Sequence, residues 1–323
     1  MQIEKTKHKE NFKMFIQKII FIILVAILSL TGVDSTDLYD VIAKYERYSA
    51  GLERKSITLD FGEMVYSENN VKSDVTLVLV HGFGGNKDTW NRVIAGLNDT
   101  YHIIAIDLPG HGESISKKTL GYTITDQAER LSLFLEAKKI KPLYLIGHSM
   151  GGAIALRYAA NHKKNLKALI LIDSMGMEQT KSDGIILVEK SDKNPLYDVC
   201  TEERLETLLN YSMHKPPYIP DVIKDALLQD KCARRELEKV IYEDMYKDVD
   251  LSGVVNSIDI PTLILWGEKD RMTHVDDAAL LHHTIKGSHL IIFKETGHVP
   301  ILEDSKQIAD EISKFIKQTV YVF

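Results

Sequence analysis

The sequence predicts an α/β protein: a mostly parallel sheet of eight strands, helices on both of its faces, and a helical cap inserted after the sixth strand. Three observations support this prediction. Short apolar runs alternate with longer helix-patterned stretches, most runs are continuously apolar, and the alternation is interrupted once, between Asp173 and Pro261. Continuous apolar strands separated by helices are typical of parallel sheets that are buried on both faces.

The expected strands follow one another along the chain. The first two, Lys55–Asp60 and Glu63–Ser67, would form an antiparallel hairpin at the sheet edge, with Gly62 in the turn. The other six are Val75–Val80, His102–Ile106, Leu143–Ile146, Ala168–Ile172, Thr262–Trp266 and Leu290–Phe293. A helix is expected over Thr125–Lys138, where apolar residues recur at near-helical spacing.

Two departures from this pattern set the expected domain boundaries. Residues 176–255 carry leucines that share helical faces but no convincing strand, so we interpret them as a helical cap over the strand ends. Residues 36–175 and 256–323 then form the core. Residues 1–35 are set apart because lysines precede the unbroken apolar run Ile19–Leu28, which is the pattern of a signal peptide or membrane anchor.

The leader predicts export, and its cleavage stays open. The apolar run is shorter than the roughly 20 residues of a comfortable membrane span, and cleavage after Ser35 would follow tolerable residues. We favour an uncleaved anchor, narrowly, with the body on the periplasmic side of the inner membrane if the host is bacterial.

Composition excludes some classes of protein. The net charge of −6 argues against a general nucleic-acid partner, and 44% hydrophobic residues are typical of a globular chain. Cys200 and Cys232 lie in no CxxC pair and near no plausible metal ligands, so no zinc site is expected. We interpret them as two unpaired thiols; a disulfide would require export.

The pentapeptide GHSMG, residues 147–151, places Ser149 between a predicted strand and a predicted helix. Flanking glycines leave room for the sharp turn that lifts a nucleophilic hydroxyl above the carboxyl end of a sheet. Serine is a weak nucleophile and needs a neighbouring base. Ser149 is therefore the candidate nucleophile.

Among the 12 histidines, His298 is the candidate base because it follows the last predicted strand. For the acid that orients it, Asp270 after the strand Thr262–Trp266 is preferred. Asp173 is the serious rival, because it follows another core strand. The chain order Ser149, Asp270, His298 is the order expected of a hydrolase with a serine elbow.

The negative charge of an acyl-transfer intermediate needs backbone donors. The N–H of Met150, at a helix N-terminus, is one candidate. A second is expected in VHGFGG, residues 80–85, where glycines let the backbone approach a substrate. We assign Phe83 N–H, with Gly84 as the alternative.

Together, HGFGGNKDTW, DLPGHGES, GHSMGG, GEKD and TGH resemble the α/β-hydrolase superfamily over residues 50–318. YERYSAGLERK and KPPYIP are similar to one subgroup: monoacylglycerol-lipase-like serine hydrolases and related bacterial lipases with an N-terminal hydrophobic segment. The resemblance implies hydrolysis of lipid-like carboxylic esters under a helical lid, and the same triad and oxyanion donors. One departure is that Val33, not a lipidated cysteine, follows Leu30-Thr31-Gly32.

The predicted function is thus a serine esterase or lipase that works through an acyl-enzyme. A carbon–carbon bond hydrolase, an amidase and a non-catalytic binding protein are the alternatives. Serine at position 149 excludes dehalogenases and epoxide hydrolases, which need aspartate there. No metal or organic cofactor is expected, and the expected partners are a lipid ester and a membrane. Tyr218 and Ile219, in the cap segment KPPYIP, are predicted to line the acyl pocket.

Overall fold

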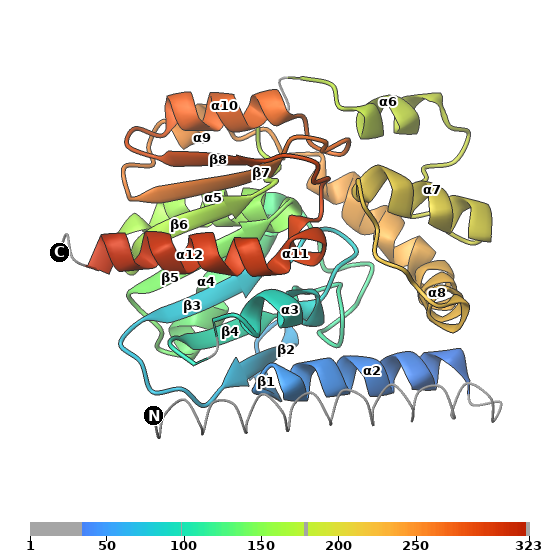
Figure 1. The fold of residues 1–323 in the computed structure, drawn as a ribbon, viewed down its shortest axis with the longest axis horizontal. Helices are drawn as coiled ribbons and strands as arrows, with labels where there is room; N and C mark the ends of the chain where they lie inside the picture. Colours follow the sequence, from blue (N-terminus) through green and yellow to red (C-terminus); the bar gives the residue numbers. More distant parts are fainter. Residues whose placement is uncertain (1–33, 98, 178–179, 321–323) are drawn as a thin grey trace, which may run out of the picture.

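The centre of the molecule is one eight-stranded sheet (Figure 1). This computed structural model describes residues 34–97, 99–177 and 180–320. The strands are β1 (Leu52–Leu59), β2 (Gly62–Asn69), β3 (Thr76–Val80), β4 (His102–Ile106), β5 (Leu143–His148), β6 (Leu166–Ile172), β7 (Thr262–Gly267) and β8 (His289–Phe293). Their order is β1-β2-β4-β3-β5-β6-β7-β8. Only the pairs β1–β2 and β2–β4 are antiparallel, which confirms the predicted fold class and the edge hairpin.

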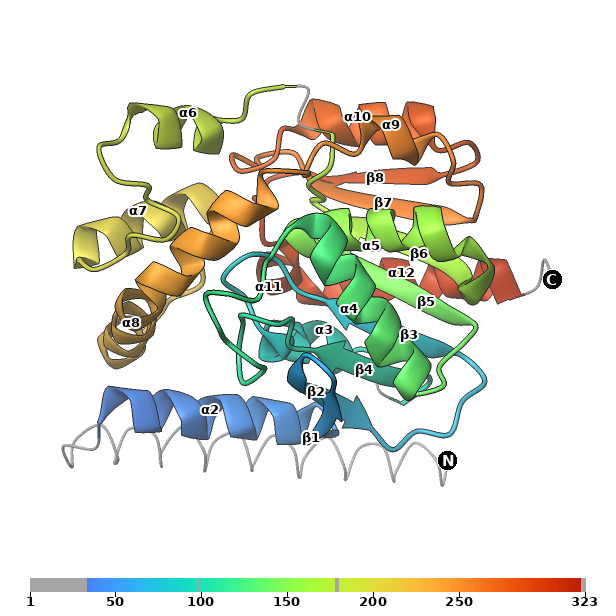
Figure 2. The same ribbon diagram turned by 180° about the vertical axis from the view of Figure 1, so that it is seen from behind.

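Helices cover both faces of the sheet, because successive strand residues point to opposite sides and supply two apolar cores. One core contains α4 (Ile124–Ala137), α5 (Met150–His162), α9 (Ser252–Val255) and α10 (Val275–Thr284). The other contains α3 (Asn91–Ile94), α11 (Pro300–Glu303) and α12 (Ser305–Val320). Figure 1 shows α12 and α3 in front of the sheet, and Figure 2 shows α4 and α5 from behind.

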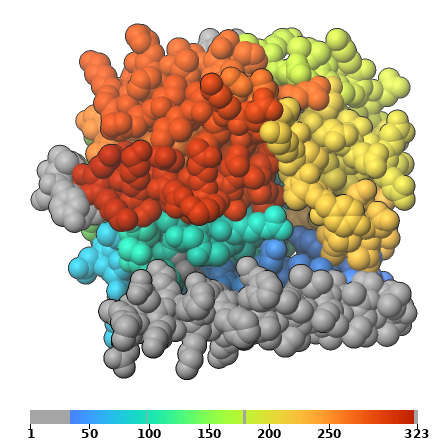
Figure 3. All heavy atoms as spheres, viewed as in Figure 1, coloured from blue at the N-terminus to red at the C-terminus, as the bar shows by residue number. Residues whose placement is uncertain are grey.

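The segment between β6 and β7 extends beyond one end of the sheet. Its described residues form α6 (Asp183–Lys190), α7 (Glu202–Ser212), α8 (Asp221–Met245) and α9, and contain no strand. Ile241 and Met245, near the C-terminal end of α8, are buried in the core. In the space-filling view α6 and α7 form a continuous surface with the C-terminal part of the core (Figure 3). We call α6, α7 and α8 the cap; its boundaries at 176 and 255 stay a prediction.

A helix that the sequence analysis did not anticipate, α2 (Ser35–Ser49), begins after the Asp34 side chain caps it. It packs against α8, beside the sheet edge (Figure 1). Arg47 on α2 donates two hydrogen bonds to Asp88, of 2.8 and 2.6 Å, and so fixes the helix to the loop after β3. No described helix is long and apolar enough to cross a membrane. The leader run Ile19–Leu28 lies outside the described residues.

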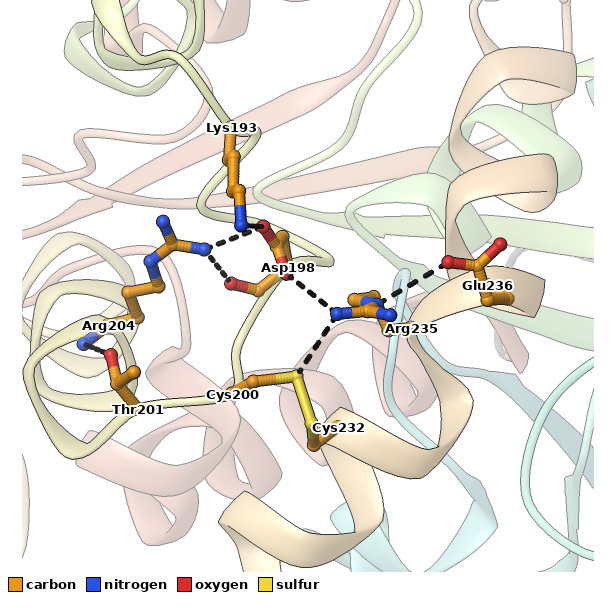
Figure 4. Close-up of a disulfide and its surroundings, with 8 residues drawn as sticks. All are labelled: Lys193, Asp198, Cys200, Thr201, Arg204, Cys232, Arg235 and Glu236. Atoms are coloured by element: carbon orange, nitrogen blue, oxygen red, sulfur yellow. Dashed lines mark hydrogen bonds and ion pairs between the residues drawn. A yellow bond between two sulfur atoms is a disulfide. The ribbon is translucent and has the colours of Figure 1, made fainter.

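Cys200 and Cys232 form a disulfide, so the interpretation of two unpaired thiols was wrong (Figure 4). The residues are 32 apart in sequence, but the packing of α8 beside the start of α7 brings their Cα atoms to 4.7 Å. That separation is within disulfide range, and sequence spacing alone does not report it. The bond lies entirely within the cap, beside Asp198 and its ion pair with Arg204.

Candidate active site

Ser149 occupies a sharp turn between β5 and α5, with φ of 53°. Glycines make this turn possible. A Cβ on Gly147 would overlap the Gly151 carbonyl, and one on Gly151 would overlap the Val80 carbonyl of the neighbouring strand. Each overlap is with backbone that cannot move alone. The left-handed φ of Ser149 is a strained conformation of the kind that clusters at functional sites.

The three side chains predicted as nucleophile, base and acid form one hydrogen-bonded chain. Ser149 Oγ lies 2.9 Å from His298 Nε2, and His298 Nδ1 lies 2.8 Å from Asp270 Oδ2. Ser149 and His298 are each only 7% exposed. Nδ1 therefore carries the proton donated to Asp270, which leaves Nε2 free to accept a proton from the serine hydroxyl.

The Asp270 carboxylate is held by three further donors. Met272 N–H and Thr273 N–H donate to Oδ1, at 2.7 and 3.0 Å, and the Thr273 hydroxyl donates to Oδ2 at 2.6 Å. Burial favours the neutral acid, but the interactions with His298 and Thr273 outweigh burial and lower the pKa of Asp270 below its usual value. The carboxylate is thus charged and fixed in orientation.

Asp173, the rival candidate, contacts a different partner. Its Oδ1 accepts the Gly267 N–H at 2.8 Å, and its side chain is fully buried at the end of β6. Burial, and then the charge of Asp270, raise the pKa of Asp173 well above its usual value. The geometry therefore favours Asp270 over Asp173 as the partner of His298.

Two other buried histidines support the loops of the site. His148 Nε2 donates to the His298 carbonyl at 2.7 Å; burial, and then the charge of His298, lower the pKa of His148 to about 3. His81 Nε2 accepts the Leu108 N–H at 3.1 Å, so Nδ1 donates to the Gly82 carbonyl at 2.7 Å. The sequence contains no signal that identifies the role of the His148 side chain. In the structure, the His148 ring bonds to the backbone carbonyl of the candidate base, His298.

The loop after β3 brings its glycine-rich backbone against the serine. A Cβ on Gly82 would lie 3.0 Å from Ser149 Cβ, so the following peptide group, with Phe83 N–H, is adjacent to the nucleophile. Met150 is the first residue of α5, where N–H groups have no acceptor within the helix. Gly84 instead lines a cavity of about 380 Å³ between α2 and α8, and its carbonyl faces Lys231. Phe83 and Met150 remain the candidate oxyanion donors.

Cap residues cover the site from the side of α8. The Phe83 ring lies 5.9 Å from the Tyr242 ring, which in turn lies 5.5 Å from Tyr197 and 4.7 Å from Tyr246. Leu237 and Val240 pack against the same core. An apolar and aromatic surface of the cap therefore lies next to the predicted oxyanion loop.

The structure does not place Tyr218 at this surface, contrary to the prediction that it lines the acyl pocket. Its side chain is 89% exposed, and Ile219 is half-buried. Three prolines hold KPPYIP in a surface loop before α8, so its apolar residues do not belong to the core. The sequence analysis did not single out Tyr242 on α8, because apolar residues at its helical spacing are typical of any helix that packs against a core.

One group of described residues, Asp173, Asp270 and His298, has donor atoms close enough to surround a metal ion. His298 and Asp270 are already engaged with each other in the hydrogen-bonded chain to Ser149. We assign no metal to this group.

A serine on a strained strand–helix turn, bonded to histidine and aspartate at the carboxyl ends of a mostly parallel sheet, defines a serine hydrolase. The family model described as alpha/beta hydrolase fold matches residues 75–195. Lipase 1 of Psychrobacter immobilis is 35% identical, covering 85% of this chain and 87% of that protein. The monoacylglycerol lipase ABHD6 of Mus musculus is 27% identical, covering 75% of each chain.

Among solved structures, a membrane phospholipase A, described as a bacterial virulence factor, superposes with a TM-score of 0.85. It is 32% identical, and the match covers 95% of this chain and 99% of that one. The chain belongs to the α/β-hydrolase family, and its predicted resemblance to bacterial and monoacylglycerol lipases is confirmed.

Proposed function

We propose that this protein is a serine hydrolase that cleaves carboxylic esters of lipids through an acyl-enzyme. The hydrogen-bonded chain from Ser149 through His298 to Asp270 carries the proposal. It supplies a nucleophile, a base with a fixed tautomer, and an acid that stabilises the charged base. The lipases and the phospholipase among its relatives support a lipid substrate.

In the first half of the reaction, Ser149 Oγ attacks the ester carbonyl while His298 Nε2 takes its proton. The N–H groups of Phe83 and Met150 stabilise the oxyanion that forms. His298 then gives the proton to the departing alcohol, and the acyl group remains on Ser149. Asp270 stays charged throughout and stabilises the imidazolium.

The second half uses the same groups on water. His298 takes a proton from a water molecule, whose oxygen attacks the acyl-enzyme carbonyl, and the acid leaves as Ser149 regains its proton. The cap limits access of bulk water, because it leaves Ser149 and His298 only 7% exposed. Low exposure strengthens the hydrogen bonds on which the oxyanion depends.

The cap surface formed by Tyr242 and its neighbours Leu237 and Val240 is the proposed acyl-binding surface, in place of Tyr218. It combines apolar area with proximity to Phe83, whose N–H is a proposed oxyanion donor. Each buried methylene of an acyl chain contributes about 0.8 kcal/mol.

Membrane attachment through the leader forms part of the proposal. The basic residues and the apolar run before α2 support export, and a disulfide in the cap is suited to an oxidising compartment. Fractionation of the native protein followed by N-terminal sequencing distinguishes an uncleaved anchor from a cleaved signal. A soluble product that begins near Thr36 would contradict the anchor.

The main test is hydrolysis of p-nitrophenyl esters of increasing acyl length, together with labelling by a fluorophosphonate. Ser149→Ala should lower kcat/KM by at least about 10⁴-fold and abolish labelling while the protein stays folded. Ser257→Ala is the control, because its hydroxyl bonds only to the nearby Val254 carbonyl on the surface. Undiminished labelling of Ser149→Ala would overturn the assignment.

A further inference from the structure

The backbone conformation and the complete burial of Asp173 are unusual for an aspartate that only bridges two strands. It has a φ of 42°, unusual for a residue other than glycine, and no exposed surface. Its N–H bonds to the Leu265 carbonyl at 3.0 Å, and its Oδ1 accepts the Gly267 N–H at 2.8 Å. Both contacts join the end of β6 to the end of β7, directly before the loop that carries Asp270.

The second oxygen of Asp173 has no donor. Within the part of the chain that the structure describes, no N–H or O–H group reaches Oδ2. The Asp270 carboxyl group lies in the same buried cluster. Oxygens of both groups and a nitrogen of His298 all lie within 4.8 Å of one another. Two charged carboxylates in one buried cluster repel each other, and Asp173 Oδ2 has no donor to offset a charge, so a proton on one of the two groups is favoured.

The surroundings decide which group holds the proton. Asp270 accepts hydrogen bonds from Met272, Thr273 and His298, all of which favour its charged form. Asp173 accepts one, from Gly267. The poorly solvated partner of a close carboxyl pair is the one that stays neutral.

We propose that Asp173 is a positioning residue that carries a proton at neutral pH and donates it from Oδ2 to the Asp270 carboxylate. The proposal rests on the proposed function, because it assigns Asp270 as the acid of the triad. A neutral Asp173 adds a donor that fixes Asp270, and it leaves a single negative charge beneath His298. A second charge there would hold His298 in its protonated form and weaken it as a base.

The charged groups around Asp173 agree with this state. Burial and the charge of Asp270 raise the pKa of Asp173, and Glu303, on α11, adds a smaller contribution in the same direction. His298 is the remaining titratable group in the cluster, and it is committed to Asp270 and Ser149.

The proton can be detected without measuring activity. Infrared difference spectra of the full-length protein at pH 7 should show the carbonyl stretch of a buried protonated carboxylic acid, and Asp173→Asn should remove it. Asp244→Asn is the control, because that carboxylate accepts the Tyr122 N–H and pairs with Lys247. Absence of the band, or its persistence in Asp173→Asn, overturns the proposal whether or not the protein hydrolyses esters.

Kinetics test the positioning role. Asp173→Gly tolerates the left-handed φ but removes the donor, and kcat should fall about tenfold. Asp173→Asn retains a donor toward Asp270 and an acceptor for Gly267, so it should restore most of that loss. Its acid-limb pKa for kcat/KM should stay close to the wild-type value. A fall of a unit or more would mean that a charge had been removed, and would overturn the proposal.

A double-mutant cycle separates positioning from a purely structural role. In Asp270→Asn the repelling charge is gone, so Asp173 can ionise near His298 and replace part of the lost acid. Asp173→Asn/Asp270→Asn should therefore fall at least about tenfold below Asp270→Asn, although Asp173→Asn alone costs little. Additive effects would show that the two carboxyl groups do not act on each other, and would contradict the proposal. Fluorophosphonate labelling of wild type tests the triad separately.

Discussion

The sheet core and the cap are stabilised by different interactions. The parallel strands β3 to β7 are almost completely buried, and glycines at the Ser149 turn meet backbone with no free space. In the cap, α7 buries only Leu205 and α6 only Gly184; the disulfide and ion pairs such as Arg204–Asp198 add further constraints. The candidate triad therefore lies where the backbone is closely packed, and α6 and α7 are less constrained by packing.

Besides the contact of Tyr242 with Phe83, two side chains of the core join these regions at the site. Glu303, on α11, accepts Gly297 N–H through one oxygen and the N–H groups of His214 and Lys215 through the other, at 2.8 to 3.0 Å. It thus links the loop before His298 to the end of α7. On the other side, Arg271 stacks 3.9 Å from the Tyr211 ring of the cap. The position of the cap is thereby coupled to the loops of both His298 and Asp270.

Outside the catalytic triad, Gly147→Ala is expected to have the largest effect, because it tests the rigidity of the core. The new Cβ would overlap the Gly151 carbonyl, and relief would displace Ser149. We expect a loss of about 3 kcal/mol in unfolding free energy and about 10²-fold in kcat/KM, measured by urea denaturation and ester hydrolysis. Gly253→Ala, in α9 with open space around it, is the matched control. If Gly147→Ala kept the wild-type unfolding free energy and kcat/KM, the predicted rigidity of the core at this turn would be contradicted.

Removal of the disulfide tests the cap alone. Cys200→Ser/Cys232→Ser opens a 32-residue loop, which should cost about 3 kcal/mol of local stability. Hydrogen exchange should accelerate in α7 and α8 while β5 and β6 keep their protection. Equal acceleration in all of these elements would show that cap and core unfold as one unit.

The pH dependence of stability tests the contribution of Glu68 at the edge of the core. Burial raises its pKa, but hydrogen bonds from His102, Lys55 and Lys138 outweigh burial and lower it to about 2, from an ordinary 4.5. The depressed pKa means that its stabilisation is complete above about 4.5 and is lost as pH falls through about 2. Glu68→Gln should cost about 2 kcal/mol at pH 7, and this difference should vanish in acid. The control is Glu53→Gln, on the same edge but exposed.

Glu303→Gln tests the contact that links the sheet core to the cap. An amide has one oxygen and cannot accept from all three N–H groups, so kcat/KM should fall about tenfold with little change in global stability. Glu268→Gln, whose carboxylate pairs only with the neighbouring Lys269, should be silent. If Glu303→Gln left kcat/KM unchanged, the cap would not be coupled to the His298 loop through this carboxylate.

Tyr218→Ala should have the smallest effect. Its side chain is 89% exposed, so stability should change by less than about 0.5 kcal/mol, and the preference for acyl length should stay the same. Tyr242→Ala should alter that preference, because its ring lies beside Phe83. A change of chain-length preference in Tyr218→Ala would restore the original prediction for KPPYIP.

The sequence by itself determined the sheet and the position of the serine turn. The strand Thr262–Trp266 is predicted by its continuous apolar character. The Ser149 turn is predicted by the glycines that flank the serine. Both signals are local in the sequence, because they depend on the period of the backbone and on residue types within a few positions of each other. The parallel topology then predicted that Ser149, Asp270 and His298, each after a strand, lie at one edge of the sheet.

Only the tertiary structure decided which distant groups meet. It paired Cys200 with Cys232, exposed Tyr218, and bonded His298 to Asp270 while Asp173 accepts the Gly267 N–H. Each outcome depends on through-space distances between elements far apart in the chain. A cysteine, a tyrosine or an aspartate has the same sequence signature whether it is bonded or free, buried or exposed, charged or protonated, because burial and neighbouring charges set those states after the elements pack.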